Sequence, residues 1–200
     1  MTAWRALVQL GDLALTLPAG AAIGAWLLAW RAQRPAAAWA LLFALGIGLV
    51  GASKIAYLAW GAGWPVLSFK APSGHAAGVA AVFPMLFYLL LYGAGARLRT
   101  AGAVAGLALG ALVAVLLVLR QEHSAAEALA GWITGALVSV TAIVASGPLP
   151  PARPLAALVW FALVFAGSAW LMQSAHVGYW MLGAARVLSG NTQLFPLGLD

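Results

Sequence analysis

Cysteine is absent from this sequence of 200 residues, which excludes a disulfide framework, a thiolate metal site and a cysteine nucleophile. Charge is also scarce, since 7% of the residues are charged, whereas a soluble domain carries roughly a quarter. So few charged side chains cannot keep a globule of this length in solution. The net charge is +6, but the basic residues are dispersed between apolar runs, which argues against a nucleic-acid partner.

Apolar side chains are abundant instead: 64% of the residues are hydrophobic, and there are ten tryptophans. A membrane-spanning helix needs about 20 mainly apolar residues, and six segments meet or approach this length. The sequence therefore predicts an all-α, polytopic membrane helix bundle that forms a single integral membrane domain over residues 1–200. The expected spans are 13–30, 37–60, 76–94, 101–119, 126–146 and 155–172.

The connections between these spans are expected to be short, because Gly, Pro and Arg residues fill 31–35, 61–72, 93–99 and 147–154. The first apolar segment is interpreted as a retained span and not as a cleaved signal peptide, because no clear cleavage site leads into a soluble domain. The tail from residue 173 onwards, which includes His176, is expected to lie at the membrane interface.

Five charged residues and two of the three histidines fall in two short regions, 54–75 and 120–127. Two predicted spans separate His75 from His123, so both histidines are expected on the same membrane face. Ionisable groups at helix ends in a membrane bundle are costly, which makes them candidates for a functional site. The residues concerned are Lys54, Lys70, His75, Arg120, Glu122, His123 and Glu127.

The first region contains Pro-Ser-Gly-His at residues 72–75, where a loop is expected to become a helix. Ser73 is a good N-cap residue, and the free amides of a first helical turn bind anions. Ser73 and the Gly74 amide are therefore candidates for holding phosphate oxygens, with His75 beside them as a proton donor. The simpler alternative is a capped helix with an interfacial histidine.

In the second region, His123 and Glu127 are four residues apart and can pair on one helix face. A carboxylate on one imidazole nitrogen fixes the tautomer and leaves the other nitrogen free to attack. An ordinary surface pair is one alternative, and a zinc site built from both histidines and Glu127 is another. The neighbouring lysines and arginine favour an anion over a cation, so neither a metal nor another cofactor is predicted.

These residues resemble the signature of the type-2 phosphatidic acid phosphatase superfamily of membrane lipid phosphatases. That signature comprises Lys-x6-Arg-Pro, Pro-Ser-Gly-His and Ser-Arg-x5-His-x3-Asp. The second block is intact at 72–75, and the third is represented by His123-x3-Glu127, with Glu in place of Asp. The similarity covers about residues 50–146, so this part of the chain would be the phosphatase-like core.

The arginines of that signature are missing. Lys54 matches the first block, but Gly61 and Ala62 occupy the Arg-Pro positions, and two leucines occupy the Ser-Arg positions of the third block. Arg120 lies one helical turn closer to His123 than the missing arginine would, which suggests that it replaces that arginine at the phosphate.

The resemblance implies hydrolysis of a lipid phosphomonoester or pyrophosphate without a metal ion. His123 would attack phosphorus, oriented by Glu127, and His75 would protonate the leaving oxygen. The phosphoryl oxygens would be held by Lys54, Ser73, Gly74 and Arg120, with Lys70 as a further contact. Membrane lipids and a phosphorylated lipid substrate are the expected partners.

The missing arginines support a second hypothesis, a catalytically degenerate member of the same fold that binds lipid headgroups or a partner. A small transporter is a third, but it would place polar residues near the bilayer midplane. When the basic residues of the candidate site are set aside, five arginines remain on the membrane face opposite the site and two on the face that holds the site. The positive-inside rule then places the site on the outer, periplasmic face of a bacterial inner membrane.

Overall fold

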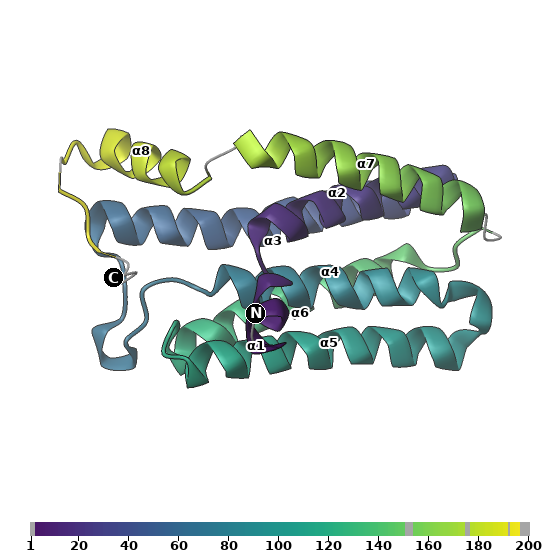
Figure 1. Ribbon diagram of the computed structural model, residues 1–200, viewed down its shortest axis with the longest axis horizontal. Coiled ribbons are helices and arrows are strands. Elements are labelled where there is room, and N and C mark those ends of the chain that lie inside the picture. Colours follow the sequence, from purple (N-terminus) through teal and green to yellow (C-terminus); the bar gives the residue numbers. More distant parts are fainter. Residues whose placement is uncertain (1–2, 151–153, 175–176, 192, 197–200) are drawn as a thin grey trace.

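The computed structural model describes residues 3–150, 154–174, 177–191 and 193–196 of the chain, and His176 lies outside these ranges. The described residues form an all-α bundle, as the composition predicts (Figure 1). Its α-helices are α1 (Ala3–Gln9), α2 (Leu13–Ala29), α3 (Gln33–Trp60), α4 (Gly74–Leu90), α5 (Ala96–Leu119), α6 (Ala125–Ser146), α7 (Pro154–Ser174) and α8 (Val177–Ser189). Two short 3-10 helices, η1 (Pro65–Leu67) and η2 (Tyr92–Ala94), lie in the connections.

Each of the six predicted spans corresponds to one helix, from α2 to α7. Helices α3, α5, α6 and α7 are long and apolar enough to cross a membrane. The other two, α2 and α4, are apolar helices of 17 residues each, which corresponds to a length of about 25 Å. Outward-facing leucines such as Leu41, Leu45 and Leu49 are more than half exposed, as expected for side chains that contact lipid. The fold is that of a multi-pass membrane protein.

Helix α4 lies at the centre of the bundle, because most of its residues are buried and it packs against both α5 and α6. Glycines make this approach possible. A Cβ atom on Gly106 of α5 or on Gly131 of α6 would collide with the backbone of α4 and of the residue before it. Small residues allow close helix contact in a membrane bundle, where packing replaces the hydrophobic effect as the driving force. These contacts fix the start of α4 relative to the start of α6.

Two helices near the ends of the chain, α1 and α8, were not predicted from the sequence. Helix α1 precedes the first span, and its Val8 packs with Ala76 and Leu117. The predicted interfacial tail contains α8, whose Ala185 packs against the end of α3 at Leu58. Two connections are shorter than predicted, since α3 begins at Gln33 and α5 at Ala96, where Arg and Ala residues continue the helix. The connection between α3 and α4 extends through Ser73, the N-cap of α4, one position beyond its predicted end.

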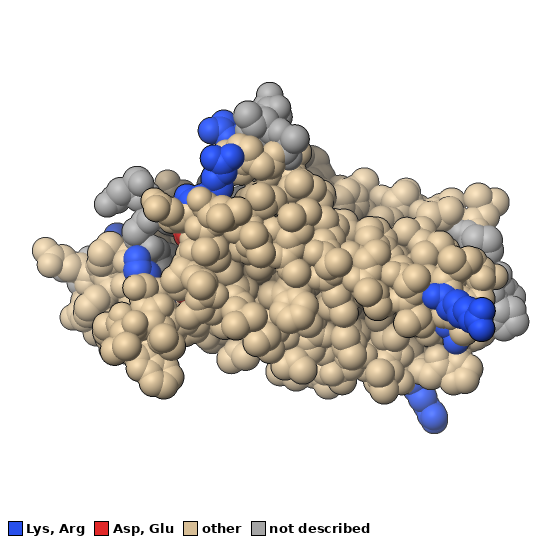
Figure 2. Space-filling view, turned by 90° about the horizontal axis from the view of Figure 1, so that it is seen from below, with Lys and Arg blue, Asp and Glu red and all other residues tan. Residues whose placement is uncertain are grey.

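Basic side chains form two groups near opposite ends of the bundle, separated on the face shown in Figure 2 by a broad region without charge. At one end, Arg31 lies in the connection before α3, Arg34 in the first turn of α3, and Arg97 and Arg99 in the first turn of α5. An uncharged middle flanked by charged ends is the arrangement that a bilayer requires.

Candidate functional site

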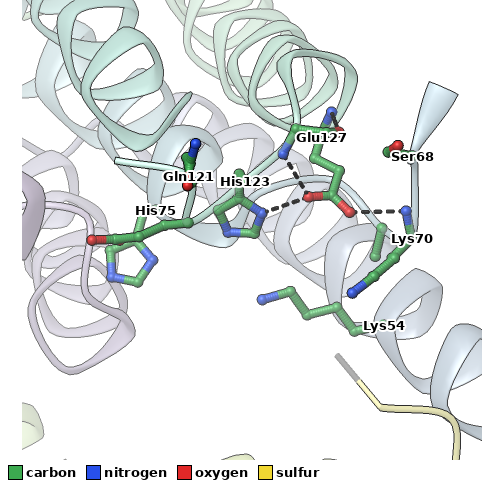
Figure 3. Close-up of a pocket in the computed structure, with 10 residues that line it drawn as sticks. Lys54, Ser68, Lys70, His75, Gln121, His123 and Glu127 are labelled. Atoms are coloured by element: carbon green, nitrogen blue, oxygen red, sulfur yellow. Dashed lines mark hydrogen bonds and ion pairs between the residues drawn. The ribbon is translucent and has the colours of Figure 1, made fainter. Parts of the chain in front are cut away.

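The two regions singled out in the sequence meet around one cavity of about 330 Å³. Four parts of the chain line it: α3, the connection between α3 and α4, the start of α4, and the connection between α5 and α6 with the first turn of α6. The lining residues are Lys54, Ser68, Lys70, Ala71, His75, Gln121, Glu122, His123, Ser124 and Glu127 (Figure 3). The fold therefore brings together both histidines, Glu127 and both lysines of the predicted site.

Glu127 organises this cavity with both of its carboxylate oxygens. Oε2 lies 2.9 Å from Nδ1 of His123 and accepts the backbone N–H of Ser124 at 3.1 Å, while Oε1 accepts the backbone N–H of Lys70 at 2.8 Å. The Glu127 side chain is 8% exposed, so these bonds compensate for taking its charge out of water. The carboxylate thus ties the connection before α4 to the start of α6.

The local sequence explains why Glu127 has this position. Ser124 is the N-cap of α6, and its hydroxyl accepts the backbone N–H of Glu127, which completes a reciprocal capping box. An ionised carboxylate can only accept hydrogen bonds, so the His123 nitrogen that faces it carries the proton. In the neutral tautomer of His123, Nε2 is then the nitrogen with a free lone pair, and the side chain is 20% exposed.

His75 faces the same cavity from the first turn of α4, on the far side of His123 from Glu127 (Figure 3). Two contacts set its position. The backbone N–H of Ser73 donates to the carbonyl oxygen of Glu127 at 2.9 Å, and Gly131 lets α6 approach Ser73 closely. The two histidines are therefore positioned by the same contact between α4 and α6.

Two lysines supply the positive charge of the cavity. The Nζ atom of Lys54, on α3, lies 3.5 Å from the point that a Cβ on Gly74 would occupy, and Figure 3 shows this side chain extending toward the histidines. Lys70 approaches from the connection, with its Nζ 6.0 Å from the ring centroid of Tyr57. A dianionic phosphoryl group between them would have two cationic neighbours.

Three residues of the predicted site lie elsewhere. Ser73 is fully buried, and its hydroxyl caps α4 by accepting the Ala76 N–H at 3.4 Å, so its side chain does not line this cavity. Gly74 lines a neighbouring cavity instead. Arg120 also does not line the site, because its guanidinium carbon lies 4.1 Å from the ring centroid of Trp4 on α1. That stacking gives the cation an aromatic partner outside the cavity.

Several lining residues were not predicted from the sequence. Ser124 could have been found, since Ser-x-x-Glu is a capping-box signal, whereas Ser68 has no recognisable signal. Ser68 and Gln121 adopt positive φ angles of 48° and 60°, a conformation that costs a non-glycine residue free energy and is concentrated at functional sites. Among the described residues, no group of three or more His, Cys, Asp or Glu side chains is arranged to hold a metal ion.

The charges around the cavity are balanced: of the described residues that line it, Lys54 and Lys70 are cationic and Glu122 and Glu127 are acidic. His75 and His123 both line this cavity, and Nδ1 of His123 is paired with Glu127. One cavity thus contains an imidazole paired with a carboxylate, a second imidazole and two lysines.

Comparisons with known proteins give one informative match. The chain is 34% identical over 142 residues to an uncharacterized 22.5 kDa protein in the cps region of Klebsiella pneumoniae, and the match covers 70% of this chain and 68% of that protein. No family model matches the chain, and no solved structure matches it.

Proposed function

This chain belongs to the same family as the 22.5 kDa protein in the cps region of Klebsiella pneumoniae, and we propose that it is a membrane-embedded lipid phosphatase that works through a phosphohistidine. The observation that carries this proposal is the placement of His75 and of the His123–Glu127 pair around one cavity. The intact Pro-Ser-Gly-His block and the His-x3-Glu spacing, which resemble type-2 phosphatidic acid phosphatases, support it.

The first half of the reaction breaks the ester bond. The Nε2 atom of His123 attacks phosphorus, and the bond between phosphorus and the leaving oxygen breaks while the proton of His75 passes to that oxygen. The new N–P bond makes the His123 ring cationic. Glu127 stabilises that charge through its contact with Nδ1, as the aspartate does for the histidine of a serine-protease triad.

The second half regenerates the protein. His75, now neutral, takes a proton from water, and the oxygen of that water attacks phosphorus as the N–P bond breaks. Inorganic phosphate leaves, His75 is protonated again, and His123 is neutral. Throughout both steps Lys54 and Lys70 offset the charge on the phosphoryl oxygens, which is the largest contribution that a protein makes to this type of transfer. No step requires a metal ion or another cofactor.

A lipid phosphate suits the position of the cavity, because it lies where α3, α4 and α6 meet at one end of the apolar part of the bundle. The hydrocarbon chain of such a substrate remains in the bilayer while its phosphate enters the cavity. The arginines Arg31, Arg34, Arg97 and Arg99 lie at the opposite end, which favours a cytoplasmic location for that end. The site then opens on the periplasmic face of a bacterial inner membrane.

A second function is favoured by one observation, the position of Arg120. With Arg120 stacked on Trp4, the cavity has only a balanced set of two lysines and two glutamates among its described lining residues. A site of low positive charge can bind a phosphate headgroup without hydrolysing it. In that case the chain is a headgroup-binding member of the same fold.

Phosphate release separates the two functions. Purified protein in detergent with EDTA is incubated with phosphatidic acid, phosphatidylglycerophosphate and a polyprenyl pyrophosphate. A phosphatase releases phosphate from at least one of them, and His123→Ala abolishes the release. Binding of these lipids without any release by the wild-type protein would support the headgroup-binding function.

A further inference from the structure

A second cavity, of about 280 Å³, adjoins the first and shares Lys54 and His75 with it. The other residues that line it come from the start of α2, from Gly74 at the start of α4, from the C-terminal end of α7 and from the N-terminal end of α8. These residues are Asp12, Leu13, Ala14, Met172, Val177 and Gly178. His75 thus separates a cavity that contains the His123–Glu127 pair from one that does not.

The geometry of phosphoryl transfer gives this second cavity a role. In a displacement at phosphorus the attacking and leaving atoms lie roughly in line, on opposite sides. With His123 as the nucleophile and His75 as the proton donor, the leaving oxygen lies on the His75 side. Whatever is attached to that oxygen then extends past His75, away from His123, and the second cavity is the space available to it.

Asp12 places a negatively charged carboxylate at a defined position in the second cavity. Its side chain is the N-cap of α2, where Oδ1 accepts the backbone N–H of Ala14 at 2.8 Å, so the carboxylate is held in position. Of the described residues that line the cavity, Asp12 is the only acid. The basic side chains among them are Lys54 and His75, and both also line the first cavity. The remaining side chains are aliphatic or a thioether, which suits a hydrocarbon group.

We infer that the second cavity is the leaving-group subsite and that Asp12 selects a neutral alcohol there, which makes the substrate a phosphomonoester and not a pyrophosphate. The inference rests on the proposed function for the direction of attack. A pyrophosphate would place a second anionic phosphate beside the Asp12 carboxylate, and like charges in contact oppose binding. Lys54 and His75, the basic side chains in this cavity, are both shared with the phosphate in the first cavity. The ester oxygen of a phosphomonoester brings no charge, and the alcohol formed when it leaves can donate a hydrogen bond to the carboxylate.

The test uses two ligands that differ by one phosphate, farnesyl phosphate and farnesyl diphosphate. Dissociation constants are measured in detergent on the His123→Ala protein, so that neither ligand is consumed, with and without Asp12→Asn. Asparagine caps a helix as well as aspartate does, so the substitution removes the charge and retains the fold. Asp12→Ser is a second variant that also retains a capping oxygen.

Asp12→Asn is expected to strengthen diphosphate binding relative to monophosphate binding by roughly threefold or more, the effect of one exposed like-charge contact. Glu122→Gln is the matched control, because it removes an equal charge from the first cavity, which holds the attacked phosphate of both ligands. It is expected to change both affinities by the same factor.

An unchanged ratio of affinities in both Asp12 variants, or an equal change of that ratio in Glu122→Gln, would overturn the assignment of this subsite. Turnover of the two ligands by protein with an intact His123 tests the proposed function separately. If His123→Ala still releases phosphate, the proposed mechanism is wrong, while the ratio of affinities still decides the role of Asp12.

Discussion

The Nδ1 atom of His123 lies 2.9 Å from Oε2 of Glu127, and Glu127 also forms, with Ser124, the capping box that starts α6. One carboxylate therefore both orients the imidazole and stabilises the local fold around it. Because the bond occupies Nδ1, only Nε2 of His123 is available as a nucleophile. This relationship connects the stability of the helix start with the chemistry of the site.

Replacing Glu127 with glutamine should separate these two roles. The Ser124 and Lys70 N–H groups donate to different oxygens of Glu127, and glutamine retains only one of these acceptors. Because glutamine is also accepted in a capping box, the protein should fold with lower stability, but its amide cannot stabilise a cationic His123. The rate of phosphate release is expected to fall by about a factor of 10³ to 10⁴, by analogy with the loss of the orienting aspartate in a catalytic triad. Steady-state kinetics and thermal unfolding of the same preparation give both values.

Glu122→Gln removes the same charge from the cavity without touching His123, and should lower the rate by much less than Glu127→Gln. Equal losses in the two variants would show that Glu127 acts through its charge alone and not through its contact with His123.

His75 is predicted to be the proton donor to the leaving oxygen, so its importance should depend on the substrate. His75→Gln should lower hydrolysis of an alkyl phosphate by about a factor of 10² to 10⁴, the usual contribution of general acid catalysis. An aryl phosphate such as para-nitrophenyl phosphate has a leaving group that needs no proton, and its hydrolysis should fall far less. The measurement is kcat/KM for both substrates.

His123→Ala should abolish hydrolysis of both substrates, because the nucleophile is lost whatever the leaving group. A loss in His75→Gln that is the same for alkyl and aryl phosphates would show that His75 does not act as the acid.

Substitutions of Arg120 test whether this residue binds phosphate, as the sequence suggests, or stacks on Trp4, as the structure shows. The sequence alone suggests that it replaces a missing phosphate-binding arginine, but its guanidinium stacks on Trp4 outside the cavity. Arg120→Ala and Trp4→Ala should each lower stability slightly, and a double-mutant cycle should give a coupling energy of about 0.5–1 kcal/mol. KM for the lipid phosphate should stay within about threefold. A tenfold rise in KM would instead place Arg120 at the phosphate.

Gly131 is expected to be essential for bringing the two histidines together. A Cβ at this position would overlap the carbonyl oxygen of Ser73, so Gly131→Ala should force α4 and α6 apart and destabilise the protein by about 1–3 kcal/mol. Phosphate release should fall as well, because the overlap occurs two residues before His75. Thermal unfolding and activity are measured together.

Gly48→Ala is the matched control, since the same methyl group on α3 would contact nothing within 4 Å. Alanine favours a helix over glycine by about 1 kcal/mol, so this variant should be at least as stable as the wild type. An equal loss in both variants would contradict the packing argument for Gly131.

Much of this fold could be predicted from the sequence, because a membrane bundle is constrained by the length of its spans and by the number of times the chain crosses the bilayer. The bilayer requires long apolar helices, so the six spans could be located from composition and length alone. An even number of crossings between His75 and His123 was enough to predict that both lie at the same end of the bundle. The His123–Glu127 pair was predicted, but not its geometry: His123 precedes α6, and Glu127 reaches it from the first turn of the helix, so the two do not share a helix face. The capping role of Ser73 followed from residue type.

The remaining features depend on tertiary contacts that spacing does not encode. Arg120 has the reach to enter the cavity, but whether it does depends on α1, a short helix with no sequence signal strong enough to predict it. Ser73 is as well suited to bind an anion as to cap a helix, and only the close approach of α6 shows that its hydroxyl is buried. The second cavity requires α2, α7 and α8 to meet, and no local pattern predicts that meeting.

The central claim is that His123 becomes phosphorylated on Nε2 during turnover. The wild-type protein is mixed with a lipid phosphate labelled at phosphorus and quenched in alkali, in which the N–P bond of a phosphohistidine persists, and the labelled residue is located by peptide mass spectrometry and phosphorus NMR. The account predicts label on Nε2 of His123 and none in His123→Ala. Phosphate release without any label on His123, or label that persists in His123→Ala, would contradict it.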